Sequence, residues 1–254
     1  MNAIILCAGY ATRMYPLTEN FPKSLLPVAG KPVIDYLMEQ LLALEKIEGI
    51  HLVTNAIFYD FFEEWSEHWQ KFLEKKNVSL QLYDDGSTSN ENRLGAAADL
   101  DLVLEKLTIN SPFFVVAGDN IFLFKTAFFW EKFLEKNCHY VMALPETDPD
   151  KLRKTGVLEL DENNRIIKLH EKPENPPSEL TCPPLYFFQP SAKKHLQEYL
   201  HDDEAKDAPG HFVNYLCQKE EVKAFVTEAS RLDIGSIESY HAAEEKMSKF
   251  KAQQ

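Results

Sequence analysis

Glycine and cysteine are both scarce in this sequence. Only 9 of the 254 residues are glycine, about half the ~7% usual in proteins. The four cysteines, which stand far apart and form no Cys-x-x-Cys pair, are Cys7, Cys138, Cys182 and Cys217. This spacing argues against a disulfide framework and a zinc site, so we expect a reduced, cytoplasmic setting. Each glycine that is present stands out as a place for a turn or for close approach of a ligand.

Long apolar runs and an excess of positive charge are also missing. Ala3–Ala8 and Phe113–Ala117 fall far short of the ~20 residues that cross a bilayer, so no membrane span is predicted. Neither a secretory signal nor a lipidation motif is recognisable at the ends. The 27 Lys and Arg against 40 Asp and Glu leave a net charge of -13, which disfavours non-specific binding to nucleic acid or anionic lipid. Any phosphate-bearing substrate must therefore be held by local groups.

The first 145 residues alternate between strand and helix patterns. The predicted strands are Asn2–Cys7, Ile50–Val53, Val78–Leu82, Phe113–Ala117 and His139–Leu144, and the predicted helices are one opened by Pro32, Tyr59–Lys75, Ala96–Leu107 and Trp130–Lys136. This alternation predicts an α/β fold with a Rossmann-like, mostly parallel mixed sheet that is flanked by helices. Ligands of such sheets bind at the carboxyl ends of the strands.

The pattern changes after Pro145. Gly156–Leu160 and Arg165–His170 flank a turn-forming Asp-Glu-Asn-Asn segment and predict a β-hairpin, and Leu185–Phe188 predicts a further strand. No linker separates the halves. We therefore expect one domain over residues 1–254, with a core over 1–145 and, over 146–254, a small β-rich lobe followed by C-terminal helices.

A glycine-containing loop leaves the first strand as Ala8-Gly9-Tyr10-Ala11-Thr12-Arg13. Backbone NH groups of such a loop can cradle phosphates, and Arg13 adds a cation at its far side. Lys23 follows between Pro22 and Pro27, where the backbone is stiff. Short glycine patterns recur by chance, so taken alone this segment also fits a plain connection with two surface cations.

The whole string from Leu6 to Ile34 resembles the signature of the sugar-1-phosphate nucleotidylyltransferases. The resemblance extends through Gly118-Asp119-Asn120, Glu171-Lys172-Pro173 and Asp233-Ile234-Gly235, over nearly the full chain. It implies an enzyme that joins a nucleoside triphosphate to a sugar 1-phosphate and releases pyrophosphate, most readily glucose 1-phosphate with dTTP or UTP. Residues 1–145 would bind the nucleotide and 146–254 the sugar phosphate.

The chemistry of this transfer explains which residue types are needed. The attacking sugar phosphate has a second pKa near ~6 and is already an anion at neutral pH, so no general base is required. Charge neutralisation and alignment remain as the main tasks. The reaction therefore calls for Arg, Lys and carboxylate-held Mg²⁺ rather than a catalytic histidine.

The resemblance also implies a role for each matching residue. Arg13, Lys23 and Asp119 are the implied catalytic residues, with Arg13 on the triphosphate and Lys23 on the phosphate that is attacked. Asp119 and Asp233 would hold Mg²⁺, although without the resemblance the first is a turn residue and the second leads a helix. The implied nucleotide-binding residues are Ala8, Gly9, Tyr10, Ala11, Thr12, Arg13, Asn92 and Gly95, and the implied substrate-binding residues are Gly156, Glu171 and Lys172.

Four departures from the family pattern bear on the base and the sugar. Arg231-Leu232 stands where a tryptophan commonly precedes the aspartate, and Ala11 replaces a second glycine. No Gln or Glu lies in the usual register before Gly95, and Pro183-Pro184 precedes the substrate strand in place of glycine. Three other functions stay open: a nucleotidylyltransferase for a non-sugar phosphate such as phosphocholine, a non-catalytic nucleotide-binding regulatory module, and a glycosyltransferase. Assembly into a homo-oligomer is also open.

Overall fold

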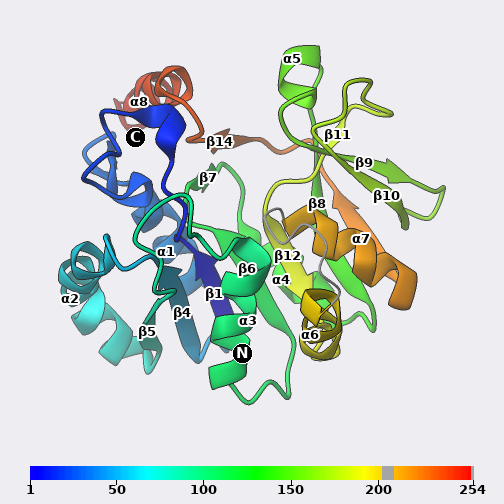
Figure 1. The fold of residues 1–254 in the computed structure, drawn as a ribbon, viewed down its shortest axis with the longest axis horizontal. Helices are drawn as coiled ribbons and strands as arrows, with labels where there is room; N and C mark the ends of the chain where they lie inside the picture. The colour runs from blue at the N-terminus through cyan, green and yellow to red at the C-terminus, as the bar shows by residue number, and fades with distance from the viewer. Residues whose placement is uncertain (202–208, 253–254) are drawn as a thin grey trace. The chain divides into compact units, whose positions relative to one another are not determined.

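The computed structural model describes residues 1–201 and 209–252, and its chain folds into two compact units (Figure 1). Unit 1 consists of Met1–Ile4, Leu94–Val116 and Phe128–Ser230, and unit 2 of Ile5–Arg93, Ala117–Ala127 and Arg231–Gln254. Each unit is built from segments far apart in the sequence. The division expected at residue 145 stays a prediction.

The α/β class expected from the sequence is confirmed. The main sheet has ten strands in the order β10-β9-β11-β8-β12-β6-β1-β4-β5, with β13 paired to β8. It is a mixed sheet, since β4 and β5 run parallel, as do β8 and β13, whereas β12 lies antiparallel to both β6 and β8. In the described residues no helix is both long and apolar enough to cross a membrane.

Unit 2 contains the N-terminal loops and the C-terminal helix. Its elements, with β1 shared between the units, are β1 (Asn2–Leu6), the 3₁₀ turns η1 (Thr12–Met14) and η2 (Lys23–Leu25), β2 (Pro27–Val28), β3 (Lys31–Pro32), α1 (Val33–Leu42), β4 (Gly49–Thr54), α2 (Tyr59–Lys76), β5 (Ser79–Asp84), β7 (Asn120–Phe122), β14 (Arg231–Asp233) and α8 (Ile237–Ala252). Ser236 caps α8, because its Oγ accepts the backbone NH of Ser239 at 3.2 Å.

One apolar cluster joins the distant segments of unit 2. Its buried members are Met14, Leu26, Val28, Val33, Ile121, Ile234, Ala243 and Met247. Met14, Ile121 and Ile234 come from three segments that lie beside one another only after folding. In Figure 1 the red helix α8 accordingly lies against the blue N-terminal loops. Each of these three buried side chains directly follows a polar residue, so the cluster fixes the positions of Arg13, Asn120 and Asp233.

Unit 1 contains the antiparallel strands and the remaining helices. Its elements are α3 (Ala96–Lys106), β6 (Phe113–Ala117), α4 (Thr126–Leu134), β8 (His139–Pro145), α5 (Pro149–Leu152), β9 (Gly156–Leu160), β10 (Ile166–Glu171), β11 (Leu180–Thr181), β12 (Leu185–Phe188), α6 (Ala192–His201), α7 (Pro209–Lys219) and β13 (Val222–Val226). The expected hairpin is confirmed as β9 and β10. The helix expected at Trp130–Lys136 begins four residues earlier and ends two residues earlier.

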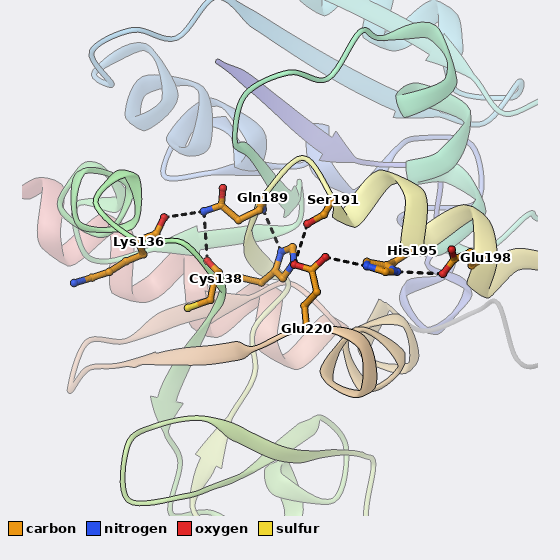
Figure 2. Close-up of polar contacts among 8 residues, drawn as sticks. Lys136, Cys138, Gln189, Ser191, His195, Glu198 and Glu220 are labelled. Carbon is orange, nitrogen blue, oxygen red and sulfur yellow. Dashed lines mark hydrogen bonds and ion pairs between the residues drawn. The ribbon is translucent and has the colours of Figure 1, made fainter.

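A polar network ties the start of β8 to helix α6 in unit 1 (Figure 2). The ring of fully buried His139 accepts the Gln189 backbone NH at Nδ1, and its Nε2 lies 3.0 Å from Glu220 Oε2. The Ser191 hydroxyl, just before α6, donates to the same Glu220 oxygen at 3.0 Å. His195 lies between Glu220 and Glu198. Since Ser191 donates to Glu220 rather than to a histidine, this network orders the scaffold and is not a nucleophilic triad.

Candidate active site

Lys23 and Asp119 form an ion pair in unit 2. Lys23 begins η2 directly after extended Pro22, and Asp119 lies in the turn between β6 and β7. The Lys23 ammonium donates to Asp119 Oδ2, and both side chains are largely shielded from solvent. The two residues are 96 positions apart in sequence. The predicted convergence of an N-terminal lysine with the Gly-Asp-Asn turn is therefore present.

Asp233 and Arg13 meet at Gly235 in the same unit. Strand β14 pairs with β7 so that Asp233 lies opposite Asn120, and the NH of Ile234 donates to the Asp119 carbonyl at 3.1 Å. A Cβ built on Gly235 would lie 3.5 Å from Asp233 Oδ1 and 3.9 Å from Arg13 Nη2. One expected metal-binding carboxylate thus directly precedes β7 and the other ends the neighbouring strand β14, and Arg13 lies beside the second of them.

Asn120 and Arg231 connect the two carboxylates. Asn120 Nδ2 donates to Asp119 Oδ1 at 2.5 Å, and its Oδ1 accepts from Arg231. The same Arg231 Nη1 lies 3.4 Å from Asp233 Oδ2. Lys23, Asp119, Asn120, Arg231 and Asp233 thus form one continuous chain of polar contacts.

The electrostatics of this group favour an ionised Asp119. Burial acts to raise the pKa of Asp119, but the Lys23 ammonium and then Arg231 outweigh it, so that the pKa lies below its ordinary value. Cys7 packs directly against Gly118, because a Cβ built on Gly118 would overlap the Cys7 Sγ. Burial raises the pKa of Cys7 to about 12, so this thiol is neutral and is no nucleophile.

The glycine-containing loop is held by contacts from other parts of unit 2. Asn55 Nδ2 donates to the Ala8 carbonyl at 3.0 Å, and the Tyr10 hydroxyl lies 3.2 Å from Ser87 Oγ. A Cβ on Gly9 would meet no atom within 4 Å among the described residues, and Gly9 is exposed. Packing therefore does not require glycine here, and its small size leaves room for a ligand.

Ala11 adopts a left-handed backbone conformation, with φ of 49°. Its carbonyl accepts the Thr18 hydroxyl at 2.9 Å and the Met14 NH at 2.9 Å, which closes η1. Ala11 thus adopts a backbone conformation that favours glycine, and these hydrogen bonds offset the conformational free-energy cost of a Cβ in this region. Thr12 and Arg13 follow, both exposed.

Asn92 and Gly95, the two residues expected near the base, have different structural roles. Asn92 is exposed, and its Oδ1 accepts the backbone NH groups of Thr88 and Ser89 at 3.1 and 2.9 Å, so its side chain organises its own loop. Gly95 directly precedes α3 with φ of 91°, a region that favours glycine, and is buried. Their contacts with a base stay predictions.

The expected sugar-binding residues belong to unit 1. Glu171 at the end of β10 pairs with Gly156 at the start of β9. Lys172 follows with φ of 46° and donates its NH to the Thr155 carbonyl at 3.1 Å. Burial raises the pKa of Glu171, against the opposing effects of His211, Lys172 and the Gly210 NH. No cation outweighs the effect of burial at this carboxyl, in contrast to Asp119.

Sequence reasoning missed three residues that contact the expected site residues. Gly210 is typical of a turn, yet it lies in the first turn of α7, where an added Cβ would overlap Glu171 Oε1. Asn120 and Arg231 bridge the carboxylates. Arg231 had a signal, because it replaces a tryptophan of the family pattern next to a candidate metal ligand. No local sequence signal pointed to Gly210, since the residue that it contacts, Glu171, lies on another element.

The residues in unit 2 fit a magnesium ion by the chemistry of their donors. Mg²⁺ in phosphate-transfer sites usually takes one or two carboxylates and completes its shell with substrate phosphates and water. Asp119 and Asp233 supply such a pair, and the Asp233 side chain is 51% exposed. Across residues 1–201 and 209–252 no three His, Cys, Asp or Glu side chains are grouped to hold a metal. The fit therefore depends on these two carboxylates together with a phosphate ligand.

Comparisons with known proteins identify the family of this chain. The model of the nucleotidyl transferase family matches residues 2–249, so the chain belongs to that family. The resemblance to sugar-1-phosphate nucleotidylyltransferases is thereby confirmed.

Two relatives match this chain over most of its length. The bifunctional protein GlmU of Methanocaldococcus jannaschii is 30% identical over 92% of this chain, and the UTP–glucose-1-phosphate uridylyltransferase AglF of Haloferax volcanii is 28% identical over 75% of this chain and 73% of its own length. The chain spans about half the length of GlmU.

Two solved structures share the fold. A Bacillus anthracis protein described as a glucose-1-phosphate thymidylyltransferase superposes with a TM-score of 0.84 at 23% identity, over 98% of this chain and 95% of its own. A UDP-glucose pyrophosphorylase bound to UDP-glucose gives a TM-score of 0.80 at 20% identity, with 98% of both chains covered. At these identities the likeness establishes the architecture alone.

Proposed function

We propose that this protein transfers a nucleotidyl group from a nucleoside triphosphate to a sugar 1-phosphate, with glucose 1-phosphate and dTTP or UTP as the favoured pair. The observation that carries the proposal is the convergence of Arg13, Lys23, Asp119 and Asp233 within unit 2. Two cations and two carboxylates at one place are what a metal-dependent attack on a triphosphate needs. The name of one relative, the UTP–glucose-1-phosphate uridylyltransferase AglF, supports the class of substrate.

Each charged residue then has one task. Arg13 binds the triphosphate and the departing pyrophosphate, for which a planar guanidinium with several donors is suited. Lys23 places its single ammonium on the α-phosphate as the sugar phosphate attacks. The oxygen–phosphorus bond to pyrophosphate breaks as the new one forms, and no protein base is needed because the nucleophile is already an anion.

Asp119 and Asp233 would hold Mg²⁺, which supplies charge neutralisation at the phosphate oxygens when it is bound. The lowered pKa of Asp119 keeps this carboxylate ionised and able to act as a ligand at neutral pH. In unit 1, Glu171 would accept hydrogen bonds from sugar hydroxyls, Lys172 would bind the sugar phosphate, and Gly156 would leave room for the ring.

A substrate panel tests the proposal. Purified protein is incubated with Mg²⁺, each nucleoside triphosphate and a set of sugar 1-phosphates, and pyrophosphate release and product mass are measured. We expect an NDP-sugar, with the highest rate for glucose 1-phosphate and dTTP or UTP. Release with phosphocholine but no sugar phosphate would establish the non-sugar alternative. Triphosphate binding without turnover of any pair would favour a regulatory module.

A further inference from the structure

Arg231 is a third cation at the proposed metal site. Its side chain is only 13% exposed, and it lies on β14 two residues before Asp233. It donates to Asn120 Oδ1 and approaches Asp233 Oδ2 at 3.4 Å. A guanidinium that is shielded from solvent loses hydration free energy, and this loss destabilises the fold unless other groups interact with its charge. The guanidinium of Arg231 is directed at a candidate metal ligand.

The charges of the group do not balance when Arg231 is included. Arg13, Lys23 and Arg231 carry three positive charges against the two negative charges of Asp119 and Asp233. Such a group attracts a polyanion and repels a free divalent cation. A metal ion that arrives bound to a triphosphate brings its own excess of negative charge and meets no such barrier.

We infer that Arg231 is a positioning residue that weakens binding of a free divalent ion, so that the ion enters the site together with the triphosphate. The inference depends on the proposed function, because it assumes that Asp119 and Asp233 bind the ion. Arg231 acts in two ways. It orients the Asn120 amide so that Nδ2 faces Asp119. In the metal-free protein, its positive charge takes the place of the metal ion beside Asp233.

Two variants separate charge from hydrogen bonding. Arg231→Gln keeps an NH₂ donor for Asn120 but removes the charge, and Arg231→Lys keeps the charge. Lys249→Met removes an exposed cation on another element, α8, and is the control. Thermal unfolding of each variant checks that it is folded.

The measurement is the binding of Mn²⁺ to the free protein, followed by the electron paramagnetic resonance signal of unbound Mn²⁺. We expect Arg231→Gln to bind Mn²⁺ about tenfold more tightly than the wild type, as Coulomb's law gives for a unit charge and a divalent ion about 6 Å apart in water. Arg231→Lys and Lys249→Met should stay within about twofold of the wild type. Metal-free triphosphate, titrated by calorimetry, should bind Arg231→Gln more weakly than the wild type.

The outcomes distinguish this inference from the proposed function. Equal or weaker Mn²⁺ binding by Arg231→Gln, with metal-dependent pyrophosphate release intact in the wild type, would overturn the role of Arg231 alone. A wild type that binds no Mn²⁺ with or without triphosphate would overturn the metal site and with it this inference.

Discussion

The two units surround their functional carboxyl groups in opposite ways. In unit 2, Asp119 contacts the Lys23 ammonium and the Asn120 amide, and its pKa is lowered. In unit 1, Glu171 is half-buried against the first turn of α7, and its pKa is raised. Side-chain cations keep one group charged, whereas desolvation makes the charge of the other more costly. The first environment suits metal and phosphate binding, and the second suits hydrogen bonds with neutral hydroxyl groups.

The largest expected effect follows from removing the charge of Asp119. Asp119→Asn keeps the shape of the side chain but loses the ion pair with Lys23 and a ligand for Mg²⁺. We expect pyrophosphate release at saturating substrate to fall at least about a hundredfold. Asp60→Asn, which changes an exposed carboxylate on α2, is the control and should retain the wild-type rate. A wild-type rate in Asp119→Asn would exclude its catalytic role.

A smaller, selective effect is expected from Gly210→Ala in unit 1. The added Cβ would overlap Glu171 Oε1, so this carboxyl must move. We expect the KM for the sugar phosphate to rise about tenfold, the effect of about 1.4 kcal/mol of lost binding, while the KM for the triphosphate stays unchanged. Gln218→Ala, at an exposed position of the same helix, should change neither constant. If both KM values rise together in Gly210→Ala, Gly210 supports the general fold rather than the sugar-binding residue.

The effect that is smallest at neutral pH concerns the stability of unit 2, and it grows as the pH falls. His51 in β4 is buried beside the Tyr83 hydroxyl, and burial lowers the pKa of His51 from 6.5 to about 4. Between pH 6.5 and about pH 4, His51 binds a proton in the unfolded chain but stays neutral in the folded chain. The free energy of unfolding therefore falls as the pH drops through this window.

Urea unfolding at several pH values between 7 and 4 measures this loss. We expect the difference in unfolding free energy between the wild type and His51→Asn to change across the window, whereas exposed His241→Asn should follow the wild type in parallel. Parallel curves for His51→Asn would show that this histidine is not held neutral.

The parts of the fold that the sequence predicted are those with long local patterns. Buried strands such as Phe113–Ala117 and helices such as Tyr59–Lys76 have periodicities that lie within one segment. Strands β7 and β14, each three residues long, form only because they pair with each other. Their composition alone gave no strand signal.

The same distinction between local patterns and tertiary contacts applies to the candidate site. Lys23 and Asp119 could be found because each belongs to a recognisable motif, and the fold brings them together. The contact of Arg231 with Asn120 joins residues 111 positions apart, and that of Gly210 with Glu171 depends on how α7 packs against β10. Neither contact follows from a local pattern. A tertiary contact between unremarkable residues is visible only in the folded chain.

Calorimetric titration with UTP or dTTP in the presence of Mg²⁺ tests the division of labour between the units most directly. The nucleotide is added to the wild type, to Arg13→Ala in unit 2 and to Glu171→Gln in unit 1, without sugar phosphate. The account predicts that Glu171→Gln binds the nucleotide like the wild type and that Arg13→Ala binds at least about tenfold more weakly, because it loses a charge-assisted contact to phosphate. Equal nucleotide affinity in wild type and Arg13→Ala, or a comparable loss in Glu171→Gln, would contradict it.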